Sequence, residues 1–411
     1  MTFPHSRSPL HPVRFINKSL KFVLKKLKGF RGVSEQLQLV RYFTLNKLLI
    51  ATGIIAFIFL VVFWIWWNRE VTFVVENDGD SQVIEDKLPV SSIAGIACQN
   101  YSKRPVAIMM SSDLETRPLS GISQADIVFE IPVTPSGITR IMAVFQCEEP
   151  EEIGSIRSAR ESFIQLAGGL GAIFVHWGGE KEALNKLNDG ILDNIDAMKY
   201  ETEYFYRKKG RLMPHNGFIN PDKILKAIID LGYDHKDDFA GYSHGKAKNT
   251  KNISNIAETL LIEYPSPFNI MWEYDPVNKI YKRIRGDKPE IDKNNGKQVE
   301  ASVVVVIETT SEYISLDYLN VNLIGGGEAR IYQNGVIIPA RWQKGAGFSE
   351  KLYFYNNEDK EIELVPGKIW VEIITTELMR LTNFKAKRVS PNNIIHDYVI
   401  AGFRFLSDKT I

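Results

Sequence analysis

Residues 158–187 read SARESFIQLAGGLGAIFVHWGGEKEALNKL, and three elements follow one another in this segment. The apolar residues of 158–167 recur at helical spacing and stop at a glycine pair, whereas 172–177 is the short, continuous apolar run of a buried strand. Residues 180–187 have helical spacing again and end before Gly190. An order of helix, strand and helix predicts a sheet with parallel strand pairs and helices on its faces.

Further strands are predicted on both sides of this segment. Short β-rich runs bounded by Pro, Gly and Ser precede it at 106–110, 127–130 and 140–145. Strands separated by Asn-Gly and Gly-rich turns follow it at 271–274, 303–308, 329–332, 351–355 and 369–374. We therefore expect an α+β or α/β fold, in which a mixed sheet with flanking helices is followed by a β-rich C-terminal part.

The chain between these groups of strands predicts helices. Residues 221–262 read as helices joined by a polar loop at 234–252, and Pro221-Asp222 is a typical helix start. Nearer the N-terminus, 68–100 is polar and reads as a stalk with one short strand at 71–75.

A segment near the N-terminus predicts a membrane anchor. Residues 48–67, LLIATGIIAFIFLVVFWIWW, carry no charge, and a helix of about 1.5 Å rise per residue and this length matches a bilayer core of about 30 Å. Trp64, Trp66 and Trp67 at its end favour the headgroup boundary. A cleaved signal peptide is the alternative, but the run is too long and no A-x-A site follows it. We expect one N-terminal transmembrane helix, with the lipid bilayer as partner.

The charges on either side of this segment predict its orientation. Residues 1–47 carry ten Lys and Arg against Glu35 alone, whereas 68–100 carries six acids against Arg69 and Lys87. Basic residues stay on the cytoplasmic side. We therefore expect a single-pass protein of the cell membrane, with a cytoplasmic N-terminus and an extracytoplasmic C-terminal domain.

Composition divides the chain into parts of different character. About 310 residues follow the stalk, more than one core usually holds, so we expect two subdomains. The net charge is +1, and removing the tail's +9 leaves about −8, a sign that argues against a nucleic-acid partner. The predicted parts are a basic cytoplasmic tail (1–47), the transmembrane helix (48–67), the stalk (68–100), an α/β part (101–265), a β-rich part (266–376) and a C-terminal extension (377–411).

The sequence carries no familiar catalytic or metal-binding signature. It has no H-E-x-x-H, G-x-S-x-G, P-loop or strand-to-helix G-x-G-x-x-G motif. Cys98 and Cys147 are its only cysteines, too far apart in the chain for a zinc site. A disulfide between them is permitted outside the membrane, and the sequence leaves their pairing open. No metal or cofactor is predicted, and the question of enzymatic activity stays open.

Two arginines suggest an anion site. Arg157 and Arg160 fall at the predicted start of the helix 158–167, where the helix dipole favours anions and disfavours cations. The functional interpretation is a carboxylate or phosphate ligand received by the guanidinium groups and the helix end. The structural interpretation is pairing with the acids just upstream, Glu148, Glu149, Glu151 and Glu152.

Two histidines lie near the ends of predicted elements. His176 closes the strand 172–177 and precedes two glycines, at the edge where α/β sheets place ligands, and His215 lies in a loop. Either one could bind a ligand or transfer protons, or could be structural. The carboxylates that could act as acid or base with them are Asp126, Glu130 and Glu180. The candidate ligand-binding residues are Arg140, Arg157, Arg160, His176, Arg207, His215 and Asn216.

At these residues the chain resembles the YerB-like family of bacterial envelope proteins, a two-part domain of unknown function. The resemblance covers about 104–376 and rests on RPVAIM at 104–109, RPLSGISQAD at 117–126, GITR at 137–140, IGSIRSAR at 153–160, HWGG at 176–179, PHN at 214–216, and Gly335, Trp342 and LVPGKIW at 364–370. It implies an extracytoplasmic α/β fold and no established reaction. Family members are typically lipoproteins, and Ser111-Ser112 stands where they usually have an Asn pair.

Three hypotheses for the function follow. The first is a binding module for an anionic cell-wall ligand, such as a glycan or peptide carboxylate, in a cleft lined by the candidate arginines and histidines. The second is an envelope hydrolase that uses Glu130 or Glu180 with His176 as acid and base. The third is a scaffold for another envelope protein, with the β-rich part as docking surface.

Overall fold

The computed structural model describes residues 53, 55–64, 89–245, 259–315, 317–376, 386–389 and 395–396. The chain forms two compact units, Met1–Asp86 and Lys87–Ile411. In the first unit, residues 53 and 55–64 are helical and expose large apolar side chains, among them Ile55, Phe57 and Trp64. Within the described residues, no helix is both long and apolar enough to cross a bilayer. The predicted span 48–67 and the strand at 71–75 lie partly or wholly outside these residues.

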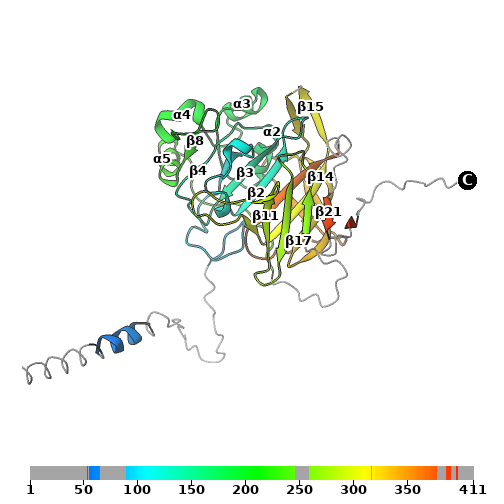
Figure 1. Ribbon diagram of the computed structural model, residues 1–411. Helices are drawn as coiled ribbons and strands as arrows, with labels where there is room; N and C mark the ends of the chain where they lie inside the picture. The colour runs from blue at the N-terminus through cyan, green and yellow to red at the C-terminus, as the bar shows by residue number, and fades with distance from the viewer. Residues whose placement is uncertain are drawn as a thin grey trace, which may run out of the picture. The chain divides into compact units, whose positions relative to one another are not determined.

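The second unit is built around a ten-stranded sheet (Figure 1). Its strands are β1 (Val106–Ser111), β2 (Ile127–Pro132), β3 (Thr139–Phe145), β5 (Ile173–His176), β6 (Asn194–Asp196), β14 (Val303–Thr309), β17 (Gly325–Gln333), β18 (Val336–Lys344), β19 (Tyr353–Tyr355) and β20 (Ile369–Thr375). Their order is β19-β18-β17-β14-β20-β2-β3-β1-β5-β6. The pairs β1–β5, β5–β6, β2–β20 and β14–β20 are parallel and the others antiparallel, which confirms the predicted mixed sheet.

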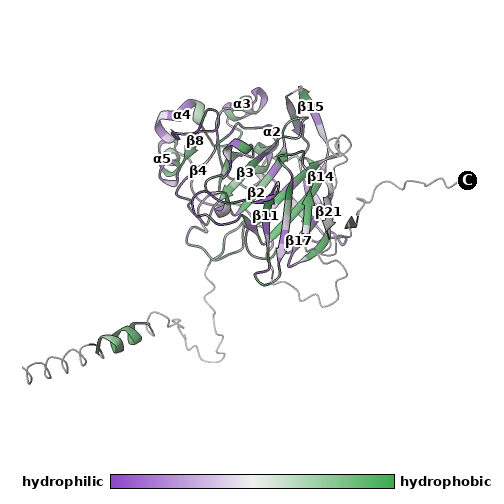
Figure 2. Ribbon diagram, in the orientation of Figure 1, coloured by the Kyte–Doolittle hydropathy of each residue, from purple (hydrophilic) through white to green (hydrophobic). Residues whose placement is uncertain are grey.

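Apolar, β-branched sequences place strands at the centre of this sheet. Strand β14 reads VVVVIET and β20 reads IWVEIIT, and nearly all of their side chains are buried. Such continuous apolar runs are typical of strands covered on both faces, and Figure 2 shows the hydrophobic colouring along β14, β2 and β3. Because β2 pairs with β20, the sheet runs through both the N-terminal and the C-terminal halves of the folded chain.

Helices cover both faces of the sheet. They are α2 (Glu161–Gly169), α3 (Lys181–Asn188), α4 (Ala197–Tyr204) and α5 (Pro221–Leu231). Buried residues of α2 and α3 belong to the hydrophobic core on one face, and those of α4 and α5 to the core on the other. The predicted start of α5 is confirmed: the Asn220 side chain accepts from the Lys223 N–H, Pro221 follows, and Gly232 ends the helix with φ 70°.

A second sheet packs on the face that carries α4 and α5. Its strands are β9 (Thr259–Ile262), β10 (Ile270–Asp275), β11 (Ile280–Arg285), β12 (Lys288–Pro289), β13 (Glu300–Ala301), β21 (Ala386–Val389) and β22 (Ile395–His396). The order is β12-β11-β10-β9-β21-β22, and β13 pairs with β11. The prediction of helix up to residue 262 is therefore wrong at its end, because 259–262 pairs with β10 as a strand.

Short elements complete the description. A hairpin consists of β15 (Ser311–Ser315) and β16 (Tyr318–Val321), and a small sheet has the order β4 (Ile153–Gly154), β8 (Gly217–Ile219), β7 (Tyr206–Arg207). Two 3-10 turns, η1 (Leu114–Thr116) and η2 (Ile122–Gln124), lie between β1 and β2. The sequence left the pairing of the two cysteines open. In the structure, Cys98 and Cys147 form a disulfide, with Cα atoms 5.6 Å apart.

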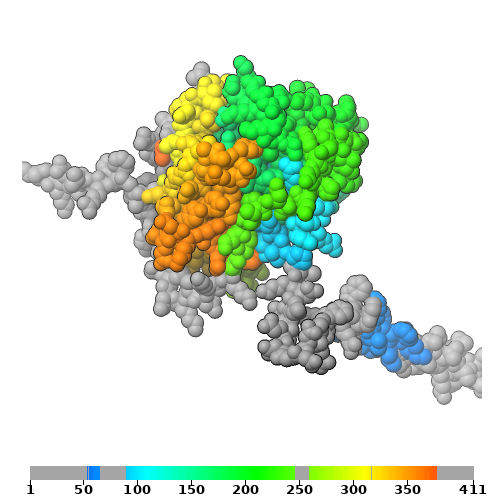
Figure 3. Space-filling model, turned by 180° about the vertical axis from the view of Figure 1, so that it is seen from behind, coloured from blue at the N-terminus to red at the C-terminus, as the bar shows by residue number. Residues whose placement is uncertain are grey.

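Segments distant in the sequence share the surface of this unit. In Figure 3, residues from the C-terminal part of the chain, in orange, lie next to a light-green strip of residues from the middle of the chain. Backbone hydrogen bonds join these segments: the Leu364 N–H donates to the Ser243 carbonyl at 2.8 Å, and the Gly245 N–H donates to the Leu364 carbonyl at 3.1 Å.

Candidate functional site

The candidate site forms where the chain leaves β1 and β5. Strand β5 pairs with the first part of β1. The last part of β1 pairs instead with the extended segment 155–157. The Ser111 N–H donates to the Ser155 carbonyl at 3.0 Å, and the Arg157 N–H donates to the Met109 carbonyl at 2.9 Å. The Trp177 N–H donates to the Arg157 carbonyl at 3.0 Å. Arg157 is therefore held between the carboxyl ends of two parallel strands, the edge at which open α/β sheets bind ligands.

Arg140 and Arg157 meet at one carboxylate. Arg140 lies in β3 opposite Ser111, and Asp113 follows two residues after Ser111. Arg140 Nη1 lies 3.2 Å from Asp113 Oδ1, and Arg157 Nη2 lies 3.4 Å from Asp113 Oδ2. His215 Nδ1 lies 3.9 Å from the same Oδ2. Sequence reasoning missed Asp113, although its position just after a predicted strand was a usable signal.

Arg160 completes this group, which we name the arginine cluster: Arg140, Arg157 and Arg160 with Asp113 and His215. Arg160 precedes α2, and its Cζ lies 4.7 Å from the centroid of the Tyr318 ring in the β15–β16 hairpin. Its Nε is 3.9 Å from Glu180 Oε2.

The start of α2 differs from the prediction. The helix begins at Glu161 rather than at residue 158, so Arg157 lies in extended chain. The first helical N–H, that of Glu161, donates to Glu180 Oε1 at 3.0 Å. Because a carboxylate of the chain already occupies the helix end, an anion would meet the guanidinium groups beside it.

Burial and mutual repulsion set the electrostatics of the cluster. Arg140 is 7% exposed and Arg160 8%. Burial, with the charges of Arg140 and Arg160, lowers the pKa of Arg157 to about 10. Burial acts to raise the pKa of Asp113, but Arg140, Ser111 and Arg157 outweigh it and lower that pKa. Asp113 is therefore ionised and Arg157 is a cation at neutral pH.

The cluster also contains polar atoms that no protein group satisfies. The Nε atoms of Arg140, Arg157 and Arg160 are buried and have no hydrogen-bond partner among the described residues. Burial and Arg157 lower the pKa of His215, so its ring is neutral at pH 7. Its Nδ1 is likewise buried without a hydrogen-bond partner within the described part of the chain. A buried donor without an acceptor lowers the stability of the fold, unless a ligand or a water molecule accepts its hydrogen bond.

His176 lies in a setting of its own. Its side chain is fully buried, Nδ1 is 2.8 Å from the Gly178 carbonyl, and Nε2 is 3.2 Å from Asn194 Oδ1. Asp196 lies 3.8 Å from Nδ1, but burial outweighs this charge and lowers the pKa of His176. Both ring nitrogens face groups of β6 and of the turn that follows β5 rather than the arginine cluster, which fits the structural interpretation of this residue.

Arg207 and Asn216 form a separate pair. Arg207 donates to both oxygens of Glu201, at 2.5 and 3.0 Å, and to Asn216 Oδ1 at 2.9 Å. Its Cζ lies 4.4 Å from the centroid of the Trp177 ring. Of the candidate residues, the structure thus brings together Arg140, Arg157, Arg160 and His215 and places His176, Arg207 and Asn216 with other partners.

The carboxylates considered for acid–base chemistry are also engaged elsewhere. Glu130 lies in β2 and His176 in β5, and β3 and β1 separate these strands in the sheet. Three strand spacings amount to about 14 Å, too far for direct proton transfer. Asp126 Oδ2 accepts from the backbone N–H groups of Gln146 and Cys147.

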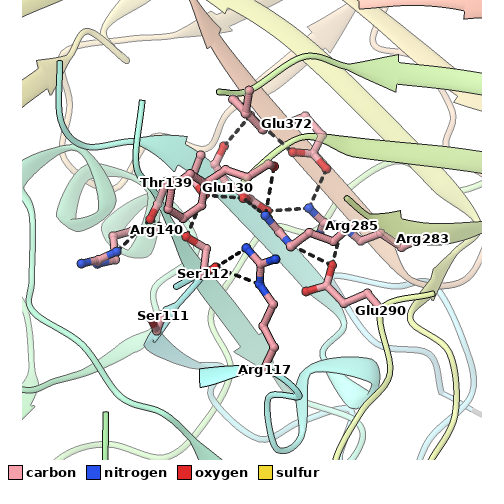
Figure 4. Close-up of polar contacts among 12 residues, drawn as sticks. Ser111, Ser112, Arg117, Glu130, Thr139, Arg140, Arg283, Arg285, Glu290 and Glu372 are labelled. Carbon is pink, nitrogen blue, oxygen red and sulfur yellow. Dashed lines mark hydrogen bonds and ion pairs between the residues drawn. The ribbon is translucent and has the colours of Figure 1, made fainter. Parts of the chain in front are cut away.

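A second group of charges, which we name the buried ion cluster, joins the two sheets. Figure 4 shows Glu130 of β2 between Thr139 and two arginines of β11. Arg283 donates to Glu130 Oε2 at 2.5 Å, and Arg285 donates to both Glu130 oxygens at 2.9 and 2.6 Å. The members of the cluster are Glu130, Arg283, Arg285, Glu290 and Glu372.

The ion cluster is enclosed by aromatic rings. Arg283 Cζ lies 3.7 Å from the centroid of the Trp370 ring, and the Trp272 Nε1–H donates to Glu372 Oε1 at 3.1 Å. Burial acts to raise the pKa of Glu130, but Arg285 and Arg283 lower it to about 2. Burial raises the pKa of Glu372 to about 7, against the effect of Arg283. In the described ranges, no three His, Cys, Asp or Glu residues are grouped as metal ligands.

Comparisons with known proteins agree with this architecture. Two family models match the chain, described as the N-terminal and C-terminal domains of a protein of unknown function (DUF3048), at residues 93–234 and 261–371. The relative named "Putative lipoprotein YerB" from Bacillus subtilis (strain 168) is 29% identical over 287 residues, which are 66% of this chain and 81% of the relative.

A solved structure is similar as well. The crystal structure of the YerB protein from Bacillus subtilis has a TM-score of 0.63 at 27% identity and covers 70% of this chain and 96% of that one. The two matched ranges together take in more than half of the chain and include the arginine cluster and, except for Glu372, the buried ion cluster. The chain therefore belongs to the YerB-like, DUF3048 family, as the resemblance predicted.

Proposed function

We propose that this protein is held in the cell membrane by residues 48–67 and binds an anionic component of the cell envelope at the arginine cluster. The observation that carries the binding proposal is that the buried Nε atoms of Arg140, Arg157 and Arg160 have no hydrogen-bond partner in the described part of the chain. Guanidinium groups recognise carboxylate and phosphate oxygens through adjacent N–H donors, and charge-assisted hydrogen bonds of this kind are among the strongest.

Charge counting supports an anion. Arg140, Arg157 and Arg160 contribute three positive charges, and the carboxylates beside them, Asp113 and Glu180, contribute two negative charges. With His215 neutral, one positive charge remains. Asp113 lies between the guanidinium groups of Arg140 and Arg157. A carboxylate of the ligand would make contacts of the same chemical kind. A glycan or peptide carboxylate of the envelope has this chemistry.

The sequence and the relative's name support the location. Residues 48–67 are uncharged, the described helix at 55–64 exposes apolar side chains, and the basic tail precedes it. The relative is named a lipoprotein, a class attached to the outer side of a membrane. Protease added to cells stripped of their wall should digest the C-terminal domain. Protection of that domain would refute the proposed orientation.

Binding can be tested with the full-length protein in uncharged detergent. The probes are soluble peptidoglycan fragments with free peptide carboxylates and the same fragments after amidation. Arg157→Gln and Arg160→Gln should each weaken binding of the acidic fragments about tenfold or more, because each removes a charge-assisted contact. Amidated fragments should bind weakly to every variant.

Two further variants sharpen this test. Arg341→Gln changes a surface arginine paired with Asp359 and serves as the matched control, which should bind like the unchanged protein. Asp113→Asn removes the internal carboxylate and should strengthen binding, because the ligand no longer competes with it. Equal binding by all four variants, or no preference for the acidic fragments, would eliminate the arginine cluster as a ligand site.

A further inference from the structure

A cavity of about 680 Å³ lies apart from the arginine cluster. Three segments line it: the turn after β1 with Leu114 and Arg117, the connection between β9 and β10, and the β11–β12 turn with Arg285 and Lys288. The first segment belongs to the N-terminal family domain, and the other two belong to the C-terminal domain. Its volume is typical of small-molecule sites, which favour boundaries between domains.

Arg117 presents a fixed guanidinium group to this cavity. Its Nε and Nη2 donate to the Ser112 carbonyl at 3.2 and 2.8 Å (Figure 4). Nη2 also donates to the Pro267 carbonyl at 2.9 Å. These acceptors are neutral, so they position the group without cancelling its charge. Nη1 makes no hydrogen bond to a described residue, which leaves two donors of a cavity-lining group for a ligand.

The buried ion cluster adjoins the same cavity. Arg285, 5% exposed, lines the cavity and donates to Glu130. Including Arg117, three arginines face the three carboxyl groups of Glu130, Glu290 and Glu372. Burial raises the pKa of Glu372 to about 7, so this carboxyl group is partly protonated at neutral pH. Arg117 donates only to backbone carbonyls and forms no ion pair within the described residues, so its charge is available to a ligand.

The other walls restrict the kind of anion. Leu114, Leu261 and Pro267 provide apolar surface. At the exposed turn, Lys288 and Asp287 are adjacent and of opposite charge, and Glu263 also lines the cavity. These two carboxylates would disfavour a ligand with several negative charges.

We propose that this cavity binds a small organic carboxylate with an apolar body and one net negative charge, whose carboxylate pairs with Arg117. None of the residues that line this cavity belongs to the arginine cluster. A peptide C-terminus and a free N-acylated amino acid share the required chemistry, and the choice of probes separates the two.

The test uses the full-length protein in uncharged detergent and isothermal titration calorimetry at pH 7. The probes are N-acetylleucine, N-acetylphenylalanine and N-acetyldialanine, each compared with its C-terminal amide. At least one acid should bind in the millimolar range or tighter, and its amide should bind at least tenfold more weakly. Preference for the dialanine acid would identify a peptide terminus, and preference for a single residue would identify an acylated amino acid.

Variants assign this binding to the cavity. Arg117→Gln should weaken binding of the acid tenfold or more, and Arg341→Gln, which changes an exposed arginine outside both sites, should leave it unchanged. If Arg117→Gln does not fold, hydrogen exchange of the unchanged protein can locate the binding site instead. The acid, and not the amide, should slow the exchange of the backbone amides of residues 114–117 and 286–288. Equal binding of acids and amides, no acid binding at millimolar concentration, an unaffected Arg117→Gln variant, or protection elsewhere would each overturn the proposal.

Discussion

Replacing Glu130 by Gln should destabilise the folded domain by about 3 kcal/mol at pH 7. The Glu130 side chain is fully buried and accepts hydrogen bonds from Arg283, Arg285 and Thr139. A pKa lowered from 4.5 to about 2 corresponds to about 3 kcal/mol of preference for the ionised form. Removing one partner of a buried ion pair costs about 3–5 kcal/mol, because an uncompensated charge is left behind. The two values agree.

The same change at Glu372 should not destabilise the domain and serves as the matched control. Burial raises the pKa of Glu372, so folding favours its neutral form, and Gln is a neutral group of nearly the same shape. Gln can still accept from the Trp272 Nε1–H. We therefore expect Glu372→Gln not to lower the free energy of unfolding at pH 7.

Glu130 and Glu372 should change the stability of the folded domain with pH in opposite directions. Because the pKa of Glu130 is lowered on folding, its contribution is complete above about 4.5 and is lost as the pH falls toward about 2. Because the pKa of Glu372 is raised, stability is lost as the pH rises from about 4.5 through about 7. Glu372→Gln should therefore gain stability relative to the unchanged protein between pH 5 and 8, the range that brackets this titration.

Urea unfolding followed by tryptophan fluorescence can measure both effects. Trp272 and Trp370 flank Arg283, so their emission reports on the ion cluster itself. The full-length protein in uncharged detergent should be compared with both variants at pH 5, 7 and 8. Equal losses for the two variants at pH 7, or a loss of 3 kcal/mol for Glu372→Gln, would refute the assignment of the buried charge to Glu130.

Two further predictions concern stability. Changing Cys98 and Cys147 together to Ser should lower the free energy of unfolding by about 2–4 kcal/mol, because the disulfide spans 49 residues of chain; an unchanged urea midpoint would contradict this. Gly327→Ala should cost about 1–3 kcal/mol, since a Cβ there would lie 2.6 Å from Trp342 Nε1 and 2.8 Å from the Glu308 carbonyl; a thermal midpoint equal to that of the unchanged protein would contradict it.

The parts of the fold that sequence reasoning predicted correctly depend on local signals. Strand β14 is a run of β-branched residues, and its length and composition suffice to identify a buried strand. Helix α5 begins at a capping Asn followed by Pro221 and ends at Gly232, all of which lie within the element or next to it. Local rules hold where local and tertiary preferences agree.

The strand β9 shows how a local reading fails. TLLI at Thr259–Ile262 is a short apolar run that fits a helix or a strand, and its pairing with β10 decides between them. Pro265 and Pro267 follow directly and were a usable signal for a turn, because proline interrupts helices.

The ion cluster was missed for a different reason. Tyr281, Arg283 and Arg285 alternate on one face of β11, and a period of two does not say which face is buried. The partner of both arginines, Glu130, lies 153 residues from Arg283 in the sequence. Nothing near an arginine in the chain reveals such a partner. The arginine cluster, by contrast, was found because three of its members lie at ends of predicted strands or of a predicted helix.

The turn after β1 connects the two candidate sites. Asp113 holds Arg140 and Arg157 on one side, while the Ser112 carbonyl next to it accepts from Arg117, which lines the cavity. The Ser112 hydroxyl donates to the Thr139 carbonyl at 2.6 Å, and the Thr139 hydroxyl donates to Glu130. The two candidate sites therefore share this turn. A ligand that shifts the turn at one site should change the affinity at the other, and any such coupling is by necessity the same in both directions, so titrating each ligand in the presence of the other measures it.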